Sequence, residues 1–164
     1  MKFISLILLF VTIIFNSTYG EDQLSKKATV FVSLSPAGSF EISTSRFKGG
    51  KIKKSGNTYS VSEIYVPTEK LTSGIDLRDE HIRDRIKNET VMVKSATGKN
   101  GQGKGIIVIR DIEKEFSFSF EALSGNFIKA KFSLNLSDFK IPNLSYMGVG
   151  VENEIKLEVV LPVD

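Results

Sequence analysis

The chain has 164 residues, of which 41% are hydrophobic and 25% charged, with no cysteine, no tryptophan and one histidine. This length fits one domain, or at most two small ones, and the composition is that of a globular protein rather than a disordered one. Absence of cysteine excludes a disulfide framework, thiol catalysis and Cys-ligated zinc, and one histidine excludes a multi-His metal site. We therefore expect no metal centre and no cofactor.

The first twenty residues have the pattern of a secretory signal peptide. Lys2 supplies a positive start, the thirteen residues 3–15 are interrupted only by Ser5 and Thr12, and a polar stretch ends at Gly20. Thirteen residues are too few to span the roughly 30 Å of hydrocarbon in a bilayer. We expect cleavage after Gly20, a mature domain over 21–164 without an integral membrane span, and a periplasmic or secreted location.

Charge argues against a nucleic-acid partner. Loss of Lys2 with the signal peptide lowers the formal net charge from +3 to +2. Lys51, Lys53 and Lys54 cluster near one turn, but acidic residues are interspersed elsewhere. Nucleic-acid binding needs a concentrated basic surface, so we expect no nucleic-acid partner.

Apolar and polar residues alternate along most of the chain. Phe116, Phe118 and Phe120 alternate with serines, and the same period of two runs without error through residues 128–137. Successive side chains of a strand point to opposite faces, so each of these strands has one dry face, as in antiparallel sheets. The pattern predicts about eight strands, over 28–34, 38–48, 50–55, 58–66, 91–97, 105–112, 115–122, 126–137 and 153–163, with the second and third forming one bent strand.

One charged segment, residues 76–87, lacks this alternation and predicts a short inserted helix. Asp76 is expected to cap its N-terminus, and Asp79 and Arg83 form a favourable i,i+4 pair. A narrow apolar stripe is expected from Ile75, Ile82 and Ile86.

A sheet of about eight strands with one dry face must curl over that face or pair with a second sheet. Nine phenylalanines follow residue 20, and most fall on the predicted dry faces. An eight-stranded barrel has just enough interior for one small ligand, so these rings either fill a solid core or line an apolar cavity. The candidate interior residues are Phe40, Ile42, Phe116, Phe118, Phe120, Ala130, Phe132 and Leu134.

Two local patterns invite catalytic interpretations. Residues 98–104 fit the opening of a phosphate-binding P-loop, but Gly105 replaces the Ser or Thr, and a strand follows where a helix is needed. We interpret these glycines as a flexible hairpin loop. His81 lies among charged residues and could act as an acid–base group with Asp79, but the pattern favours a helix-surface or loop-packing histidine.

Four segments carry a resemblance to a known family. Residues 72–83 contain Thr-Ser-Gly followed by Arg-Asp-Glu-His-Ile, which resembles the central motif of the YceI-like family. Residues 38–41, 130–141 and 148–155 resemble further segments of that family, in the same order. Lys140 stands where the family has glycine after Phe139.

The resemblance implies an exported, mainly β protein: a lipocalin-like antiparallel β-barrel that holds a long amphiphile, such as an isoprenoid quinone, a polyprenyl lipid or a fatty-acid amide. The partner is then a hydrophobic small molecule, and a homodimer is compatible with the sequence. Arg78, His81 and Arg83 are candidates for contact with the ligand headgroup.

Three alternatives belong to other classes. A ligand-free, solid-cored barrel would act as an interaction or stress-response protein, and an enzyme on the same scaffold would use His81 with Asp79. An outer-membrane barrel is disfavoured because the chain ends in Leu-Pro-Val-Asp and lacks the usual terminal aromatic residue.

Overall fold

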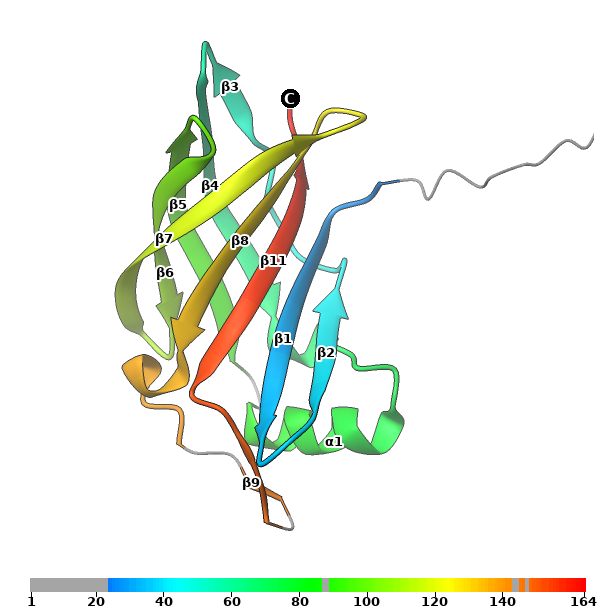
Figure 1. The fold of residues 1–164 in the computed structure, drawn as a ribbon. Coiled ribbons are helices and arrows are strands. Elements are labelled where there is room, and N and C mark those ends of the chain that lie inside the picture. The colour runs from blue at the N-terminus through cyan, green and yellow to red at the C-terminus, as the bar shows by residue number, and fades with distance from the viewer. Residues whose placement is uncertain (1–23, 87–88, 143–144, 147) are drawn as a thin grey trace, which may run out of the picture.

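The computed structural model describes residues 24–86, 89–142, 145–146 and 148–164. The predicted signal peptide, residues 1–20, lies outside the described residues. Within them the chain forms one antiparallel sheet of eleven strands, one α-helix and two short 3-10 helices (Figure 1). The predicted fold class, a mainly β antiparallel sheet with one short helix, is confirmed.

Eight of the strands are long and match the predicted alternation. They are β1 (Lys27–Ser35), β2 (Ser39–Thr44), β4 (Thr58–Pro67), β5 (Thr90–Lys99), β6 (Gln102–Ile109), β7 (Ile112–Leu123), β8 (Phe127–Asn135) and β11 (Glu154–Pro162). Three short strands are β3 (Lys53–Ser55), β9 (Ser145–Tyr146) and β10 (Val149–Val151). Residues 38–55 do not form the one bent strand expected, because β2 pairs with β1 whereas β3 pairs with β4. The helices are α1 (Asp76–Arg85) and the 3-10 turns η1 (Thr68–Lys70) and η2 (Leu136–Phe139).

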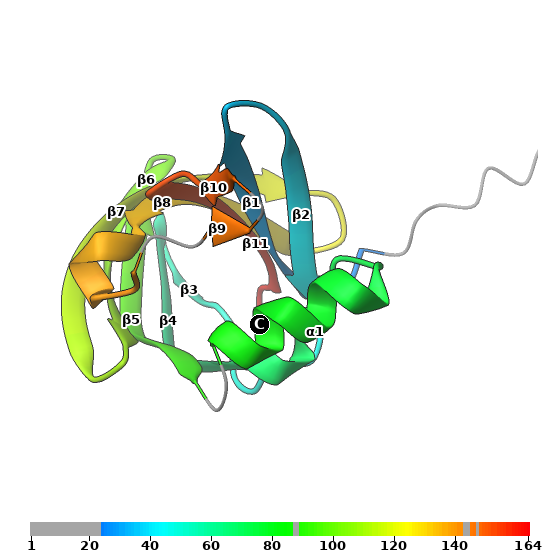
Figure 2. The ribbon, with the colours of Figure 1, turned by 90° about the horizontal axis from the view of Figure 1, so that it is seen from below.

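Most strands pair with their neighbours in sequence. The strand order across the sheet is β3-β4-β5-β6-β7-β8-β11-β1-β10-β9, and β2 pairs with β1. The sheet coils round an interior, as the end-on view shows (Figure 2). Between the edges of β2 and β4 the pairing is reduced to two isolated bridges, Ser43 with Thr72 and Lys48 with Tyr65. We call this line, where residues 43–48 face residues 65–72, the seam.

The register places apolar residues in rows across the inner face. Phe120 on β7 lies opposite Ala130 on β8, which lies opposite Val159 on β11, and Val159 in turn lies opposite Ala28 on β1. Directly opposite residues of antiparallel strands share a face. The period of two read from the sequence therefore becomes one continuous dry wall.

The glycine-rich stretch is strand rather than the expected flexible loop. β5 runs to Lys99 and β6 begins at Gln102, so the turn consists of Asn100 and Gly101 alone. Their φ angles are 54° and 80°, as a type I′ hairpin turn requires. Glycine lowers strand propensity, but here neighbouring aromatic side chains occupy the space that the missing side chains leave.

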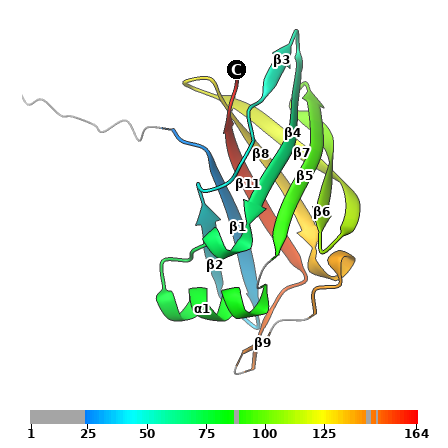
Figure 3. The same ribbon diagram turned by 180° about the vertical axis from the view of Figure 1, so that it is seen from behind.

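The helix forms where predicted, but two of its details differ. Asp76 does not cap it: the N-cap residue is Ile75, with no side-chain capping bond. Ile75 is 49% exposed, so the expected apolar stripe lacks that member. α1 lies at one end of the coiled sheet, below β2 in the view from behind (Figure 3).

Candidate functional site

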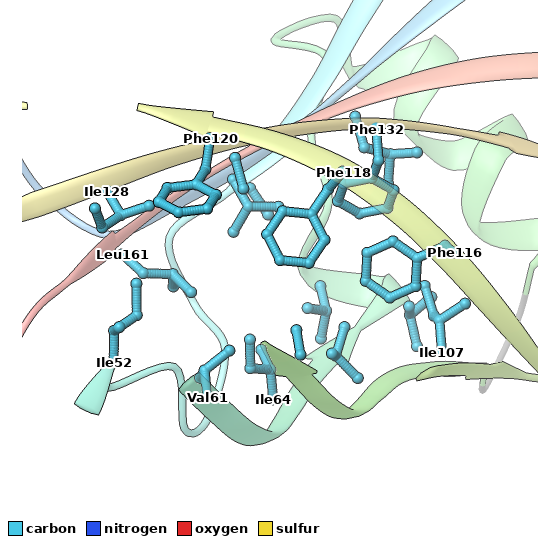
Figure 4. Close-up of a pocket in the computed structure, with 18 of the residues that line it drawn as sticks. Ile52, Val61, Ile64, Ile107, Phe116, Phe118, Phe120, Ile128, Phe132 and Leu161 are labelled. Carbon is cyan, nitrogen blue, oxygen red and sulfur yellow. The ribbon is translucent and has the colours of Figure 1, made fainter. Parts of the chain in front are cut away.

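The coiled sheet encloses an apolar cavity of about 130 Å³ (Figure 4). Its walls come from seven long strands, β1, β4, β5, β6, β7, β8 and β11, together with Phe47, Ile52 and Leu71 from the connecting segments. Of the described residues that line it, Tyr59 and Ser60 alone carry a polar side-chain group. Such a wall favours hydrocarbon and offers water almost no hydrogen-bonding partner.

Five of the eight predicted interior residues line this cavity. They are Phe116, Phe118, Phe120, Ala130 and Phe132. The other three lie elsewhere: Leu134 is buried in the core cluster that contains Phe116, Ile42 is buried on β2, and Phe40 is half-buried near the start of β2. Contact with a ligand stays a prediction for all eight of the residues named from the sequence.

The aromatic residues of the cavity form a connected row. The ring centroids of Phe116 and Phe118 are 5.8 Å apart, and those of Phe118 and Phe120 are 6.1 Å apart. Phe132 joins Phe116 at 4.6 Å, and Tyr59 meets Phe120 edge-on at 5.5 Å. These spacings lie in the range of favourable ring pairs, so the row forms a continuous aromatic wall.

The rings of β7 lie against glycines of the neighbouring strands. A Cβ atom built on Gly103 would lie 2.3 Å from Cζ of Phe118, and one built on Gly105 would lie 2.7 Å from Cε1 of Phe116. No side chain could occupy those positions while the rings remain there. The glycines therefore leave room for the rings at the wall, away from the centre of the cavity.

The opposite wall was missed by the sequence analysis. Figure 4 shows Val61 and Ile64 across the cavity from the phenylalanine rings, and Ile107 beside Phe116. Alternation of Tyr59 and Val61 with serines along β4 is a signal that could have found part of this wall. Phe47 lies in a connecting segment where no periodicity marks it.

The predicted headgroup residues all lie on α1, and none of them lines the cavity. The Arg78 guanidinium lies 4.5 Å from the centroid of the Phe40 ring, a cation–π contact. His81 is exposed on the same helix, and Arg83 lies 3.9 Å from the carboxylate of Asp79. The predicted Asp79–Arg83 pair is thus present, and headgroup contact stays a prediction.

Asp79 is a buried carboxylate that fastens the loop before α1. Its Oδ1 accepts hydrogen bonds of 2.6 Å from both the backbone N–H and the hydroxyl of Ser73, and its Oδ2 accepts one from the Thr72 hydroxyl. Burial alone would raise the pKa of Asp79, but these hydrogen bonds and the Arg83 charge outweigh it, and the pKa lies below its ordinary value. Thr72, Ser73 and Asp79 of the motif at residues 72–83 therefore have a structural role, because their hydrogen bonds attach the loop to the helix.

Neither a metal cluster nor a membrane-spanning helix is found in the described parts of the chain. No three His, Asp or Glu side chains there come together as metal ligands would, and no helix there is both long and apolar enough to cross a bilayer.

Comparisons with known proteins agree with this architecture. Residues 20–163 match the YceI-like domain family. Among solved structures, the chain is similar to a polyisoprenoid binding domain from Saccharophagus degradans implicated in plant cell wall breakdown, with 12% identity and a TM-score of 0.55 over 83% of this chain and 91% of that one. At this identity the likeness shows the fold. A comparison with curated proteins found no similar sequence.

Proposed function

The chain belongs to the YceI-like domain family, and from this membership and its apolar cavity we propose that it binds the tail of an isoprenoid or similar long-chain amphiphile inside the sheet. The observation that carries the proposal is the cavity wall, which is built almost wholly from hydrocarbon side chains. Polyisoprenoid binding by the structurally similar domain supports the same class of ligand. Binding, rather than catalysis, is the proposed role.

Burial of methylene groups would supply the affinity. Each buried CH₂ contributes about 0.8 kcal/mol before ordering costs. An engineered dry cavity of about 150 Å³ binds one benzene molecule, so the 130 Å³ seen here holds a short part of a long tail. A longer tail requires the cavity to expand while the Phe118 and Phe120 rings stay over their glycines.

A second candidate, a ligand-free interaction protein, is favoured by that same modest volume. In such a protein the aromatic row would be part of a filled hydrophobic core, and the cavity would be a packing defect. The two functions differ in whether a stoichiometric guest accompanies the purified protein.

We also propose, from the signal-peptide pattern of residues 1–20, that the protein works in the periplasm or after secretion. An isoprenoid quinone, a polyprenyl lipid and a fatty-acid amide are all ligands of the proposed class. Their common feature is a long tail, which the cavity would select, with a polar head outside it.

The test is native mass spectrometry of protein exported by its host and purified without detergent, followed by solvent extraction. A stoichiometric long-chain amphiphile is expected, and its identity would name the ligand. A bare polypeptide mass that persists after incubation with quinones, polyprenols and fatty amides would contradict the proposal and favour the ligand-free interaction protein.

A further inference from the structure

A second depression, outside the sheet at the seam, has a very different lining. It is an open groove of about 750 Å³, and four of the nine residues that line it are cationic. They are Lys26, Arg46, Lys48 and Lys70. None of the described residues that line the groove has a carboxylate side chain, whereas Ser45, Tyr65 and Thr90 add hydroxyl groups. We call this depression the basic groove.

The four cations of the basic groove lack acidic partners among the described residues. None of them lies within 4.0 Å of a described carboxylate oxygen. Lysines of the outer sheet face behave differently: Lys94 pairs with Glu113 at 2.6 Å and Lys104 with Glu115 at 2.9 Å. Grouped like charges repel one another, and an anion that enters the groove would relieve this repulsion.

Phe47 separates the basic groove from the apolar cavity. It is 5% exposed and lines both spaces. Lys26 holds it from outside, because the Lys26 ammonium donates a 2.6 Å hydrogen bond to the Phe47 carbonyl and lies 4.7 Å from the centroid of its ring. One side chain therefore stands between a cationic surface and a hydrocarbon interior.

The location of Phe47 adds to the argument. Its segment crosses the seam, where the isolated Ser43–Thr72 and Lys48–Tyr65 bridges replace a continuous ladder (Figure 3). Elsewhere in the coiled sheet, β4 through β8, β11, β1 and β2 are joined by ladders of several residue pairs. A wall with few backbone hydrogen bonds opens at lower cost than a continuous one.

We propose that the basic groove binds the phosphate head of an anionic amphiphile whose tail enters the cavity past Phe47. This inference rests on the proposed function and narrows its ligand class. Arginine offers a planar fork of donors that fits phosphate oxygens, and lysine ammonium groups add point charges. A phosphate head would thus meet Arg46, Lys48 and Lys70 outside the sheet while its hydrocarbon chain leaves water.

The experiment compares geranylgeranyl phosphate with geranylgeraniol, which has the same tail and no charge. Binding of each is measured by native mass spectrometry and by calorimetry at low and high salt. Three variants are used: the groove triple Arg46→Gln, Lys48→Gln, Lys70→Gln; a control with the same charge change, Lys51→Gln, Lys53→Gln, Lys54→Gln; and the helix double Arg78→Gln, Arg83→Gln.

The wild-type protein is expected to bind the phosphate about tenfold or more tightly than the alcohol, with a preference that falls at high salt. The groove triple should lose that preference while its affinity for the alcohol stays unchanged. The control triple and the helix double should keep it, because their cations lie outside the groove.

Each other outcome overturns the inference in a distinguishable way. Equal binding of the two ligands to the wild-type protein, or loss of preference in the helix double alone, would remove the groove as the headgroup site and leave the proposed function intact. Binding of neither ligand would contradict the proposed function itself. Inorganic phosphate that binds as tightly as geranylgeranyl phosphate would show an anion site unconnected to the cavity.

Membrane docking is the remaining distinguishable result. If the groove triple loses flotation with phosphatidylglycerol vesicles but keeps its preference for the phosphate ligand, the groove serves a bilayer surface, and the inference is wrong.

Discussion

A Cβ atom on Gly98 of β5 would lie 2.5 Å from Cε1 of Phe120 on β7, so the phenylalanine ring takes the space of the missing side chain. The same relationship joins Gly103 to Phe118, and Gly105 to Phe116. Three rings thus lie over three glycines. The volume of the cavity depends on these pairs, because a ring that is displaced from its glycine moves into the cavity.

The first prediction replaces Gly98 by alanine. The added methyl group must displace the Phe120 ring, since the nearest atoms to it belong to that ring. Overpacking of this kind costs about 1–3 kcal/mol, and we expect that loss in the free energy of unfolding measured with urea. The amount of amphiphile bound should also fall, because the displaced ring enters the cavity.

The matched control for Gly98 is the double variant Gly98→Ala, Phe120→Leu. Removal of the ring takes away the clash, so the cost of the alanine should be much smaller in the Phe120→Leu background, as a double-mutant cycle would show. An alanine that costs the same in both backgrounds would mean that the backbone, not the ring, requires glycine.

Much of the fold was predictable because burial on one face imposes a period of two. The strict alternation at Phe116, Phe118 and Phe120 located β7, and its inward face proved to be the cavity wall. The glycine stretch was misinterpreted because glycine is normally weak in strands. Its role depends on a contact between β5, β6 and β7 that no local pattern encodes.

The site was only partly predictable for a related reason. Ala130 and Phe132 were found because they lie on an alternating strand, whereas Phe47 and Lys26 lie in segments without periodicity. They come together only when the chain crosses the seam. The basic groove combines Arg46 and Lys48 with Lys26 and Lys70, which lie far from them in the sequence, so no local pattern shows that the four share one surface.

The second prediction fills the cavity from β8. Ala130 is a small lining residue opposite Phe120, and Ala130→Phe would place a ring in the open space. We expect loss of amphiphile binding with stability changed by no more than about 1–3 kcal/mol. Native mass spectrometry after ligand loading measures the first effect, and urea unfolding measures the second.

Ser117→Phe provides the comparison for Ala130→Phe. Ser117 is exposed on the outer face of β7, so a phenylalanine there adds the same side chain outside the cavity. Binding should persist in this variant. Equal loss of binding in both variants would argue against the interior as the binding site.

The third prediction concerns acid stability. The pKa of Asp79 is depressed in the folded protein, so its charged form stabilises the fold. That stabilisation is fully present above the ordinary pKa of 3.8 and is lost as pH falls through the lower folded value. Asp79→Asn should lower the free energy of unfolding at pH 7 by about 1–3 kcal/mol, because an amide matches the Ser73 and Thr72 donors poorly.

Below pH 3.8 the difference between wild type and Asp79→Asn should shrink, since the wild-type carboxylate then loses its charge as well. Asp84→Asn, an exposed change on the same helix, is the control and should leave the free energy of unfolding at pH 7 nearly unchanged. Urea unfolding at several pH values measures all three proteins. A constant difference between pH 7 and pH 2 would show that the Asp79 charge does not contribute.

The last prediction concerns Lys140, which ends η2 with φ 54° and ψ 29° in the left-handed region. A residue with a Cβ atom pays about 1–2 kcal/mol there relative to glycine, while glycine loses about 0.4–1 kcal/mol through its freer unfolded chain. Lys140→Gly should therefore raise the free energy of unfolding by up to about 1.6 kcal/mol. The bond from Arg110 to the Lys140 carbonyl involves backbone and survives the change. Lys140→Ala keeps the strain and should stay near wild type, so a gain with alanine as large as with glycine would assign the effect to the lysine side chain instead.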